Sequence, residues 1–358
     1  MQSCDIIIPV WNQLEATRDC VNSIIKHTGY PYRIIFIDNA SDKATGDYLN
    51  ELKNKAHFNV ILIRNDRNLG FAKAVNQGLE VSNAGYVCIM NNDTIATTSW
   101  LGEMIDLMKA DSAMGMVNPS SNTSGQFPAK SQSIDEYALG LKRFKGETQE
   151  LYTCRGFCML LTREVLEVLG PFDETYDIGF FEETDYSMRA GEKGFKIARA
   201  KASYVYHKEG LSFKERKDSN SIFENNERIF LKRWGKPSRV GFFFDRMESP
   251  GRIDDMAITA ARRGHQVLIF LKRGVGWPVT IDHFGIRRFD VNPLFFYFVS
   301  IYKILKRKSK KKLDVILTDN PFFGSFLMYI KFLHGSDVMI RPDKNSLLEL
   351  LSTKSRNF

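Results

Sequence analysis

This 358-residue sequence lacks several patterns that would mark particular classes of protein. Its five cysteines, Cys4, Cys20, Cys88, Cys154 and Cys158, are odd in number and lie mostly within apolar runs. This usage predicts reduced, buried thiols in a cytosolic protein rather than a disulfide framework. Cys154 and Cys158 also do not have the Cys-x2-Cys spacing of a zinc site. No Gly-x-Gly-x-x-Gly follows the first strand pattern, which argues against an NAD enzyme.

Long apolar runs are missing as well. No stretch reaches the roughly 18 uninterrupted apolar residues that would predict a membrane span. A strand pattern begins within a few residues of Met1, so we expect no secretory signal peptide. Together these features predict a cytoplasmic protein.

The composition, with 43% hydrophobic and 26% charged residues, is that of an ordinary globular protein. The length predicts two or three domains. Charge is unevenly distributed, because the residues from Arg239 onward hold 21 Lys and Arg against 11 Asp and Glu, a net of +10, whereas the whole chain has +8. We therefore expect an anionic surface as a partner of the C-terminal third only.

Strand and helix patterns alternate along the first 90 residues. Strands are predicted over 5–10, 32–37, 59–63 and 87–90, with helices over 14–26, through Leu52 and over 70–81. This alternation predicts a mostly parallel sheet with right-handed crossovers.

The pattern then becomes more varied. A polar, Ser-rich segment over 118–150 predicts a loop with one short helix. After it we expect a strand over 154–161, helices over 163–169 and 180–194, short strands over 196–200 and 203–206, and a helix over 219–234. Residues 235–238 are typical of a linker, which predicts one domain over 1–236 and another over 239–358. In the second domain we expect strands over 239–244, 267–271 and 313–317, with helices over 254–263 and from 322.

Acid and amide side chains follow the predicted strands. Asn91-Asn92-Asp93 comes directly after the apolar run 85–90, and Asp38 and Asp42 end the second strand. Oxygen ligands of this kind suit a hard divalent cation, and such a cation suits a diphosphate. The alternative is that Asn-Asn-Asp is simply a turn.

Several motifs in order carry a family resemblance. They are Ile-Pro-Val-Trp-Asn at 8–12, Ile-Asp-Asn-Ala-Ser-Asp at 37–42, Asn-Leu-Gly-Phe-Ala-Lys-Ala-Val-Asn-Gln-Gly at 68–78, Met-Asn-Asn-Asp at 90–93, Gly-Phe-Cys-Met-Leu-Leu-Thr-Arg-Glu at 156–164, Gly-Pro-Phe-Asp-Glu at 170–174 and Phe-Glu-Glu-Thr-Asp-Tyr-Ser-Met-Arg-Ala at 181–190. Their order and spacing resemble family 2 glycosyltransferases of the GT-A fold, most closely the rhamnosyltransferase-like branch. The resemblance covers roughly residues 3 to 234.

The resemblance implies roles for individual residues. Nucleotide binding is implied for Pro9, Val10, Asn12, Asp38, Asn68, Gly70 and Asn92, with Asp38 hydrogen-bonded to the base. Binding of a divalent cation, Mn²⁺ or Mg²⁺, is implied for Asp93, His207 and Asn91. Asn91 stands where the family's Asp-x-Asp element usually has its first Asp, which predicts a weaker cation site. A structural histidine is the alternative for His207.

The resemblance also implies an inverting mechanism. Glu183 matches the family's usual catalytic base, normally an Asp, and is one methylene longer. Asp185 is the second catalytic candidate, expected to position the acceptor or to hold Arg189 in an ordinary helix pair. For Glu182 we expect a solvated helix face.

Residues 239–358 resemble, less specifically, the N-terminal half of a GT-B glycosyltransferase, through Arg-Arg-Gly-His-Gln-Val at 262–267 and Leu-Asp-Val-Ile-Leu-Thr-Asp-Asn-Pro at 313–321. We expect a fragment of a longer bifunctional enzyme, with a domain that only supports the first as the alternative. The aromatic segment 293–302 precedes a basic run at 303–312, which predicts attachment to the anionic inner face of the plasma membrane. A core helix followed by a solvated loop is the alternative. Nothing resembles a nucleic-acid readout module.

These features predict an inverting, metal-dependent glycosyltransferase. By resemblance, it moves a sugar, with dTDP-rhamnose favoured, from a nucleotide donor to a hydroxyl of a lipid-linked or growing bacterial surface polysaccharide such as O-antigen. Another hexose or galactofuranose donor is the alternative within enzymes. A catalytically weak or inactive sugar-binding or scaffolding module is the alternative outside them.

Overall fold

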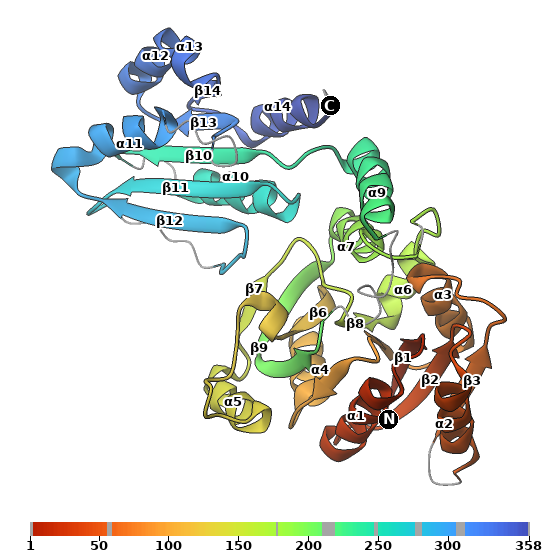
Figure 1. The fold of residues 1–358 in the computed structure, drawn as a ribbon. Coiled ribbons are helices and arrows are strands. Elements are labelled where there is room, and N and C mark those ends of the chain that lie inside the picture. Colours follow the sequence, from red (N-terminus) through yellow and green to blue (C-terminus); the bar gives the residue numbers. More distant parts are fainter. Residues whose placement is uncertain are drawn as a thin grey trace. The chain divides into compact units, whose positions relative to one another are not determined.

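The structure is a computed structural model that describes residues 3–55, 59–176, 178–209, 219–246, 250–275, 281–305 and 312–356. Residue contacts divide the chain into two compact units. The N-terminal unit comprises Met1–Gln149 and Thr153–Ile229, and the C-terminal unit comprises Glu150–Tyr152 and Phe230–Phe358. Each unit is a sheet with helices packed on it (Figure 1).

The first half of the N-terminal unit alternates strands and helices as the sequence predicts. Its elements are β1 (Cys4–Val10), α1 (Leu14–His27), β2 (Tyr32–Asp38), α2 (Lys43–Asn54), β3 (Val60–Arg64), α3 (Phe71–Val81) and β4 (Tyr86–Met90). The strands β1 and β4 are almost wholly buried, which explains their continuous apolar sequences.

The second half is less regular. It contains β5 (Thr94–Ala96), α4 (Trp100–Ala110), β6 (Met114–Ser120), the 3-10 helix η1 (Asn122–Ser124), α5 (Ile134–Leu141), the 3-10 helix η2 (Lys142–Phe144), β7 (Thr148–Glu150), β8 (Cys158–Thr162), α6 (Arg163–Leu169), α7 (Glu182–Glu192), β9 (Lys196–His207) and α9 (Ser219–Trp234).

Among the described residues the strands form one nine-stranded sheet in the order β3-β2-β1-β4-β8-β6-β9-β5, with β7 paired to β9. Strands β3, β2, β1 and β4 are parallel, whereas β8 runs antiparallel to β4 and β6. This confirms the expected α/β class with a mostly parallel sheet flanked by helices. All five cysteines are free and buried, as the sequence predicts.

Several elements of the N-terminal unit differ from the sequence-based expectation, among them the short strands β5 and β7, which were not predicted. Residues 196–206 were expected to form two short strands, but β9 is one continuous strand from Lys196 to His207, because it pairs along its length with β6, β7 and β5. Helix α4 and strand β6 were not predicted. The polar segment 118–150 contains the expected short helix α5, started by a capping box between Ser133 and Glu136.

The C-terminal unit has a second, fully parallel sheet. Its elements are β10 (Arg239–Phe244), α10 (Pro250–Arg262), β11 (Gln266–Lys272), β12 (Ile286–Val291), the 3-10 helix η3 (Pro293–Phe295), α11 (Phe296–Leu305), β13 (Val315–Thr318), α12 (Pro321–Tyr329), α13 (Lys331–His334), β14 (Asp337–Ile340) and α14 (Lys344–Arg356). The described strands lie in the order β12-β11-β10-β13-β14. Apolar clusters fill both faces of this sheet, one against α10 and α14 and the other against α11 and α12.

None of the helices in the described part of the chain is both long enough and apolar enough to cross a membrane.

Candidate active site

The register of the parallel strands brings the predicted site residues to one edge of the sheet. Val10 at the end of β1 pairs with Asp38 at the end of β2, and Ile7 pairs with Ile89 near the end of β4. The polar residues that follow these three strands therefore meet at the carboxyl edge, where open α/β sheets bind ligands.

Asn12 connects the loops after the three strands. Its backbone N–H donates to Ser41 Oγ at 2.9 Å, and its Oδ1 accepts from the Asp42 N–H at 2.8 Å. Its carbonyl oxygen accepts from Asn92 Nδ2 at 3.4 Å. Asn12 has φ = 57°, a left-handed conformation that asparagine adopts more readily than most residues. The predicted nucleotide residues Pro9, Val10, Asn12 and Asn92 thus lie together.

Asp38 is fully buried and already bonded within the protein. Its Oδ1 accepts from the Ser41 N–H at 2.8 Å, and its Oδ2 accepts from the Arg64 guanidinium at the end of β3. Arg64 also donates to the Ser41 carbonyl at 3.0 Å. Asp38 therefore stabilises the loop after β2, and its hydrogen bond to a nucleotide base remains a prediction. Asp42 has a second task, because it caps α2 by accepting from the Thr45 N–H at 2.8 Å.

Gly70 holds the loop before α3 in a conformation that glycine favours. Its φ is 86°, and a Cβ at this position would lie 2.7 Å from the Cα of Ile178. Its N–H donates to Asn68 Oδ1 at 2.9 Å, and its carbonyl accepts from Asn39 Nδ2 at 3.2 Å. Asn68 and Gly70 are thus tied to the loop after β2.

Asp93 and His207 meet where the turn after β4 faces the end of β9. Strands β5 and β9 pair antiparallel with Thr94 opposite His207, so the turn before β5 faces the end of β9. His207 Nε2 lies 3.0 Å from Asp93 Oδ1, and the Lys208 N–H donates to the Asp93 carbonyl at 2.9 Å. Asn92 and Asp93 lie in a turn, as the alternative interpretation predicted, and this turn presents Asp93 to His207. The role of this motif in cation binding stays a prediction.

Two residues that the sequence did not single out position His207. Asn122 Oδ1 accepts from the His207 N–H, and Asn122 Nδ2 donates to the His207 carbonyl, both at 2.8 Å. The ring of Phe157 stacks on the imidazole with centroids 5.4 Å apart. Phe157 lies in one of the family motifs, whereas Asn122 lies in a Ser-rich segment that gave no signal.

The Asp93 carboxylate is a suitable ligand for Mn²⁺ or Mg²⁺, whereas the His207 imidazole suits a transition-metal ion such as Mn²⁺ better than Mg²⁺. Within the described residues no third His, Cys, Asp or Glu completes a cluster with them. Asn91 is partly buried, and its backbone is fixed by a hydrogen bond from its N–H to the Phe157 carbonyl at 2.9 Å. The pair therefore fits a cation that takes its remaining ligands from amide oxygen, water and a diphosphate, as Mg²⁺ commonly does.

Glu183 lies in the first turn of α7, near the segment that packs on His207. A Cβ on Gly156 would lie 3.7 Å from Glu183 Cγ, while the next residue, Phe157, stacks on His207. The buried Glu183 Oε2 has no hydrogen-bond partner among the described residues. Burial raises the pKa of Glu183, although the positive charge of Arg155 acts in the opposite direction.

Glu182 is buried, so the expectation of a solvated helix face is wrong. Its Oε2 also has no partner within the described structure. Burial, and then the neighbouring Glu183 charge, raise the pKa of Glu182 well above its usual value. Because like charges repel, ionisation of one of these two adjacent carboxyls disfavours ionisation of the other.

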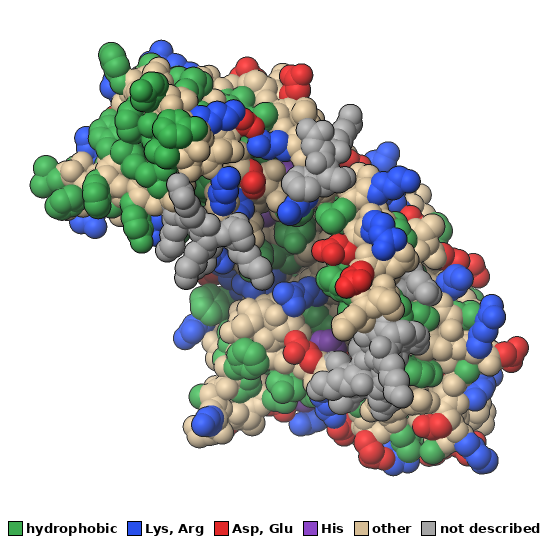
Figure 2. Space-filling model, turned by 45° about the horizontal axis from the view of Figure 1, so that its top comes forward, with side chains coloured by type: hydrophobic (Ala, Val, Ile, Leu, Met, Phe, Trp, Pro, Cys, Tyr) green, Lys and Arg blue, Asp and Glu red, His purple; other side chains and the backbone are tan. Residues whose placement is uncertain are grey.

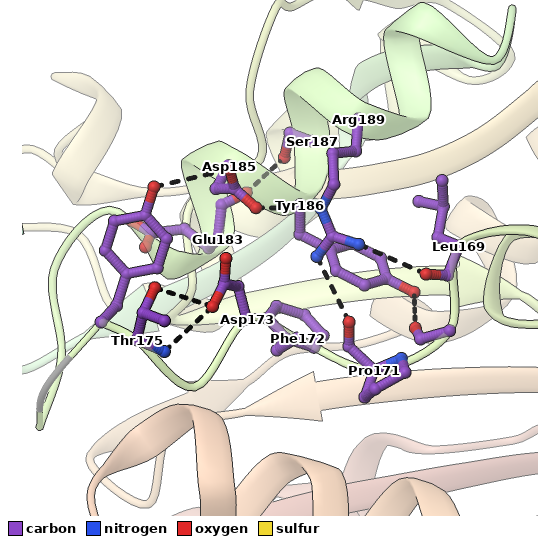
Figure 3. A network of polar contacts seen from close by, with 12 residues as sticks. Leu169, Pro171, Phe172, Asp173, Thr175, Glu183, Asp185, Tyr186, Ser187 and Arg189 are labelled. Carbon is purple, nitrogen blue, oxygen red and sulfur yellow. Dashed lines mark hydrogen bonds and ion pairs between the residues drawn. The ribbon is translucent and has the colours of Figure 1, made fainter. Parts of the chain in front are cut away.

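Asp185 forms the helix pair that the sequence offered as one of its roles. Its Oδ2 accepts from Arg189 Nε at 2.9 Å, and its Oδ1 accepts from the Tyr176 hydroxyl at 3.4 Å. Arg189 extends from α7 toward the carbonyl oxygens of Leu169 and Pro171, each 3.3 Å away (Figure 3). Asp185 is fully buried in this network. Its direct participation in catalysis remains a prediction.

Residues 5–170 match the family model of glycosyl transferase family 2. Glycosyltransferase AglE of Haloferax volcanii is 22% identical over 199 residues, which cover 54% of this chain and 63% of the relative. Poly-beta-1,6-N-acetyl-D-glucosamine synthase of Staphylococcus aureus is 25% identical over 202 residues, which cover 55% of this chain and 48% of the relative. The solved mannosyltransferase PcManGT from Pyrobaculum calidifontis, in complex with GDP-Man and Mn²⁺, has a TM-score of 0.47 at 16% identity and covers 58% of this chain and 57% of its own.

The chain thus spans about half to two thirds of the length of the proteins it resembles. The matched range contains Asp38, Asn91 and Asp93, and the same compact unit supplies Glu183 and His207. Apart from residues 150–152, the range that matches the glycosyl transferase family 2 model lies within the N-terminal unit.

Proposed function

We propose that this protein transfers a sugar from a nucleotide donor to a hydroxyl group of a glycan, with inversion at the anomeric carbon. The observation that supports this best is the meeting of Asp93 and His207 at 3.0 Å, joined through the adjacent Gly156 and Phe157 to the buried carboxyl of Glu183. One edge of the sheet thus offers cation ligands and a separate carboxylate.

Asp93 and His207, with Asn91 beside them, would hold a Mn²⁺ or Mg²⁺ ion. When bound, the cation supplies positive charge against the departing nucleoside diphosphate. The loops of Asn12, Asp38 and Gly70 would hold the nucleotide itself, because they are tied together at the same edge.

Glu183 acts as the general base in this proposal. Its carboxylate accepts the proton of the acceptor hydroxyl while that oxygen bonds to the anomeric carbon and the bond from this carbon to the donor phosphate breaks. Burial raises the pKa of Glu183, which makes the carboxylate a stronger base than an exposed one. Asp185 holds Arg189 and so fixes the first turns of α7, from which Glu183 projects.

The motif order favours dTDP-rhamnose as the donor, with another hexose or galactofuranose donor as the alternative. A lipid-linked or growing bacterial surface polysaccharide is the proposed acceptor, reached from the inner face of the plasma membrane through the segment 293–312. Residues 306–311 of this segment lie outside the described residues.

For the C-terminal unit we propose correspondence to the N-terminal half of a GT-B glycosyltransferase. Its parallel five-stranded sheet supports this proposal, because a βαβ arrangement in which the chain switches direction about β10 is typical of Rossmann-like halves.

A second candidate is a sugar-binding module with little or no activity. Asn91 in place of an acid, together with only two His or acid ligands in the described structure, favours it. Release of free nucleotide from a nucleotide sugar by the purified protein with Mn²⁺ would separate the two, because a binder does not turn over.

The decisive test is a thermal-shift screen of dTDP, UDP and GDP and their sugars with and without Mn²⁺. A ligand at 100 times its Kd stabilises a protein by about 2.7 kcal/mol, so a shift of several degrees is expected for the cognate nucleotide. The shift should disappear when Mn²⁺ is removed with EDTA. If no nucleotide shifts the transition under any condition, the proposal is wrong.

A further inference from the structure

Two segments of the C-terminal unit contain no acidic residue. The first runs from Val291 to Leu313 and holds seven Lys and Arg, and the second runs from Asn320 to Ser336. Both are rich in Phe and Tyr. Residues 256–281 of the same unit also contain no acidic residue but have only two aromatic residues, Phe270 and Trp277, so the many Phe and Tyr, rather than the lack of acid alone, distinguish the two segments.

Helix α11, from the first segment, has one inward and one outward face. Phe296, Ser300 and Ile304 are buried at helical spacing. Phe298 and Tyr302, one turn apart, are exposed instead, and Phe298 is 74% exposed. An outward face that is aromatic rather than polar is unusual for a helix at the surface of a water-soluble unit.

Helices α12 and α13, from the second segment, repeat this arrangement. Phe323 and Leu327 face the core, while Phe322, Tyr329 and Phe332 are 89%, 81% and 80% exposed. Helix α13 contacts both α11 and α12, so the three helices are neighbours. Figure 2 shows hydrophobic side chains gathered over the end of the C-terminal unit that these helices form in Figure 1.

The outward side chains of α11, α12 and α13 thus make one surface, which we call the aromatic surface. The basic run begins at Lys303, in the last turn of α11, and continues in the sequence after the helix ends at Leu305. Lys331, which begins α13, is paired with Asp337 at 2.6 Å. Aromatic rings beside a run of Lys and Arg complement the interface of an anionic bilayer, where rings enter the headgroup region and Lys and Arg meet lipid phosphates. A protein partner of mixed charge would be matched less well.

We propose that the aromatic surface of α11, α12 and α13 docks this protein onto an anionic lipid bilayer. The inference extends the membrane attachment in the proposed function, where only 293–312 was assigned, by adding α12 and α13 as a second lipid contact. It rests on the proposed function for the lipid-linked acceptor, but lipid binding itself needs no catalysis.

The test is co-sedimentation of the full chain with phosphatidylcholine vesicles, with and without phosphatidylglycerol, at physiological ionic strength. The parent protein should bind the vesicles that contain phosphatidylglycerol, and higher salt should weaken this binding. The triple variant Phe322→Ser, Tyr329→Ser, Phe332→Ser should lose at least about tenfold in affinity for these vesicles. It removes three interfacial rings and leaves every basic residue in place.

Phe284→Ser is the matched control, since Phe284 is a 54% exposed phenylalanine of the same unit outside the aromatic surface. It should bind as the parent does. Equal binding of parent and triple variant, or no binding by the parent, would overturn the proposal. So would light scattering that shows a dimeric parent and a monomeric triple variant, because a second copy would then cover the surface. The nucleotide thermal shift, measured without vesicles, should be the same in parent and triple variant. Failure of that shift in the parent, with vesicle binding retained, would count against the proposed function alone.

Discussion

His207 Nε2 lies 3.0 Å from Asp93 Oδ1, although 114 residues separate the two in the chain. The pairing of β5 with β9 brings them together. Both side chains are largely buried, so the contact is set by the fold rather than by chance encounter of surface groups.

Replacement of Asp93 by Asn should therefore weaken Mn²⁺ binding by more than about tenfold, because a neutral amide is a poorer ligand than a carboxylate. Electron paramagnetic resonance of free Mn²⁺ in the presence of nucleotide measures this directly. Asp47→Asn is the control, since Asp47 is an exposed carboxylate paired with Lys43 on α2. Unchanged Mn²⁺ affinity in Asp93→Asn would remove Asp93 from the cation site.

Replacement of Glu183 by Gln should lower turnover by about 10²–10⁴-fold while donor binding stays the same, since the amide cannot accept the proton of the acceptor. Glu183→Asp, which restores the family's usual residue, should keep part of the activity. Glu192→Gln, at the exposed end of α7, should have no effect. Full turnover in Glu183→Gln would rule out this base.

The same carboxyl predicts a pH dependence. Because burial raises the pKa of Glu183, the active carboxylate form should be lost as the pH falls through a value above that of an exposed glutamate. The acid limb of a kcat/KM profile should accordingly lie at higher pH than the usual glutamate pKa. An acid limb at or below that pKa would contradict the assignment.

Glu182 should make the parent protein less stable as the pH rises. Burial raises the pKa of Glu182 in the folded protein above its value in the unfolded chain. As the pH rises between these two values, the unfolded chain loses the proton while the folded protein keeps it, so the free energy of unfolding falls. Glu182→Gln removes the effect, and its advantage over the parent should grow with pH by at most about 1.4 kcal/mol per pH unit.

Urea denaturation at about pH 5 and about pH 8 measures this difference. Glu192→Gln serves as the control, because it makes the same substitution at an exposed position at the end of the same helix. An advantage of Glu182→Gln that shrinks as the pH rises would refute the argument.

Two glycines should respond to alanine in opposite ways. Gly70→Ala places a Cβ 2.7 Å from the Ile178 backbone at φ = 86°, so it should cost about 1–3 kcal/mol and weaken nucleotide binding. Gly140 lies in α5 with open space around it, so Gly140→Ala should stabilise by about 0.5–1 kcal/mol. Both values come from urea denaturation. A harmless Gly70→Ala would show that the loop before α3 can move.

The parts of the site that sequence predicted best are those set by local pattern. The run Ile6-Ile7-Ile8 and the apolar stretch before Asn91 predicted β1 and β4, and polar residues directly after them had to lie at the carboxyl edge. The pairing of Asp93 with His207 came only from family resemblance, because no local pattern joins residues so far apart.

Other features depended on tertiary contacts that a single sequence does not reveal. Strand β5 is three residues long and exists because β9 pairs with it. Asn122 has the composition of a loop residue, and its role follows from the backbone of His207 lying beside it. Glu182 has the sequence of an exposed helix residue, yet the packing around α7 buries it.

Asn122 hydrogen-bonds to the backbone of His207, and the antiparallel pairing of β9 with β5 fixes the same backbone. Neither interaction involves the imidazole nitrogens. An ion held by both His207 and Asp93 would therefore require the two side chains to adjust without a change in the His207 backbone. We therefore expect the ion to bind fast and to leave amide-exchange protection in β5 and β9 unchanged. The backbone of these strands is ordered when the protein folds, so it does not have to become ordered in each catalytic cycle.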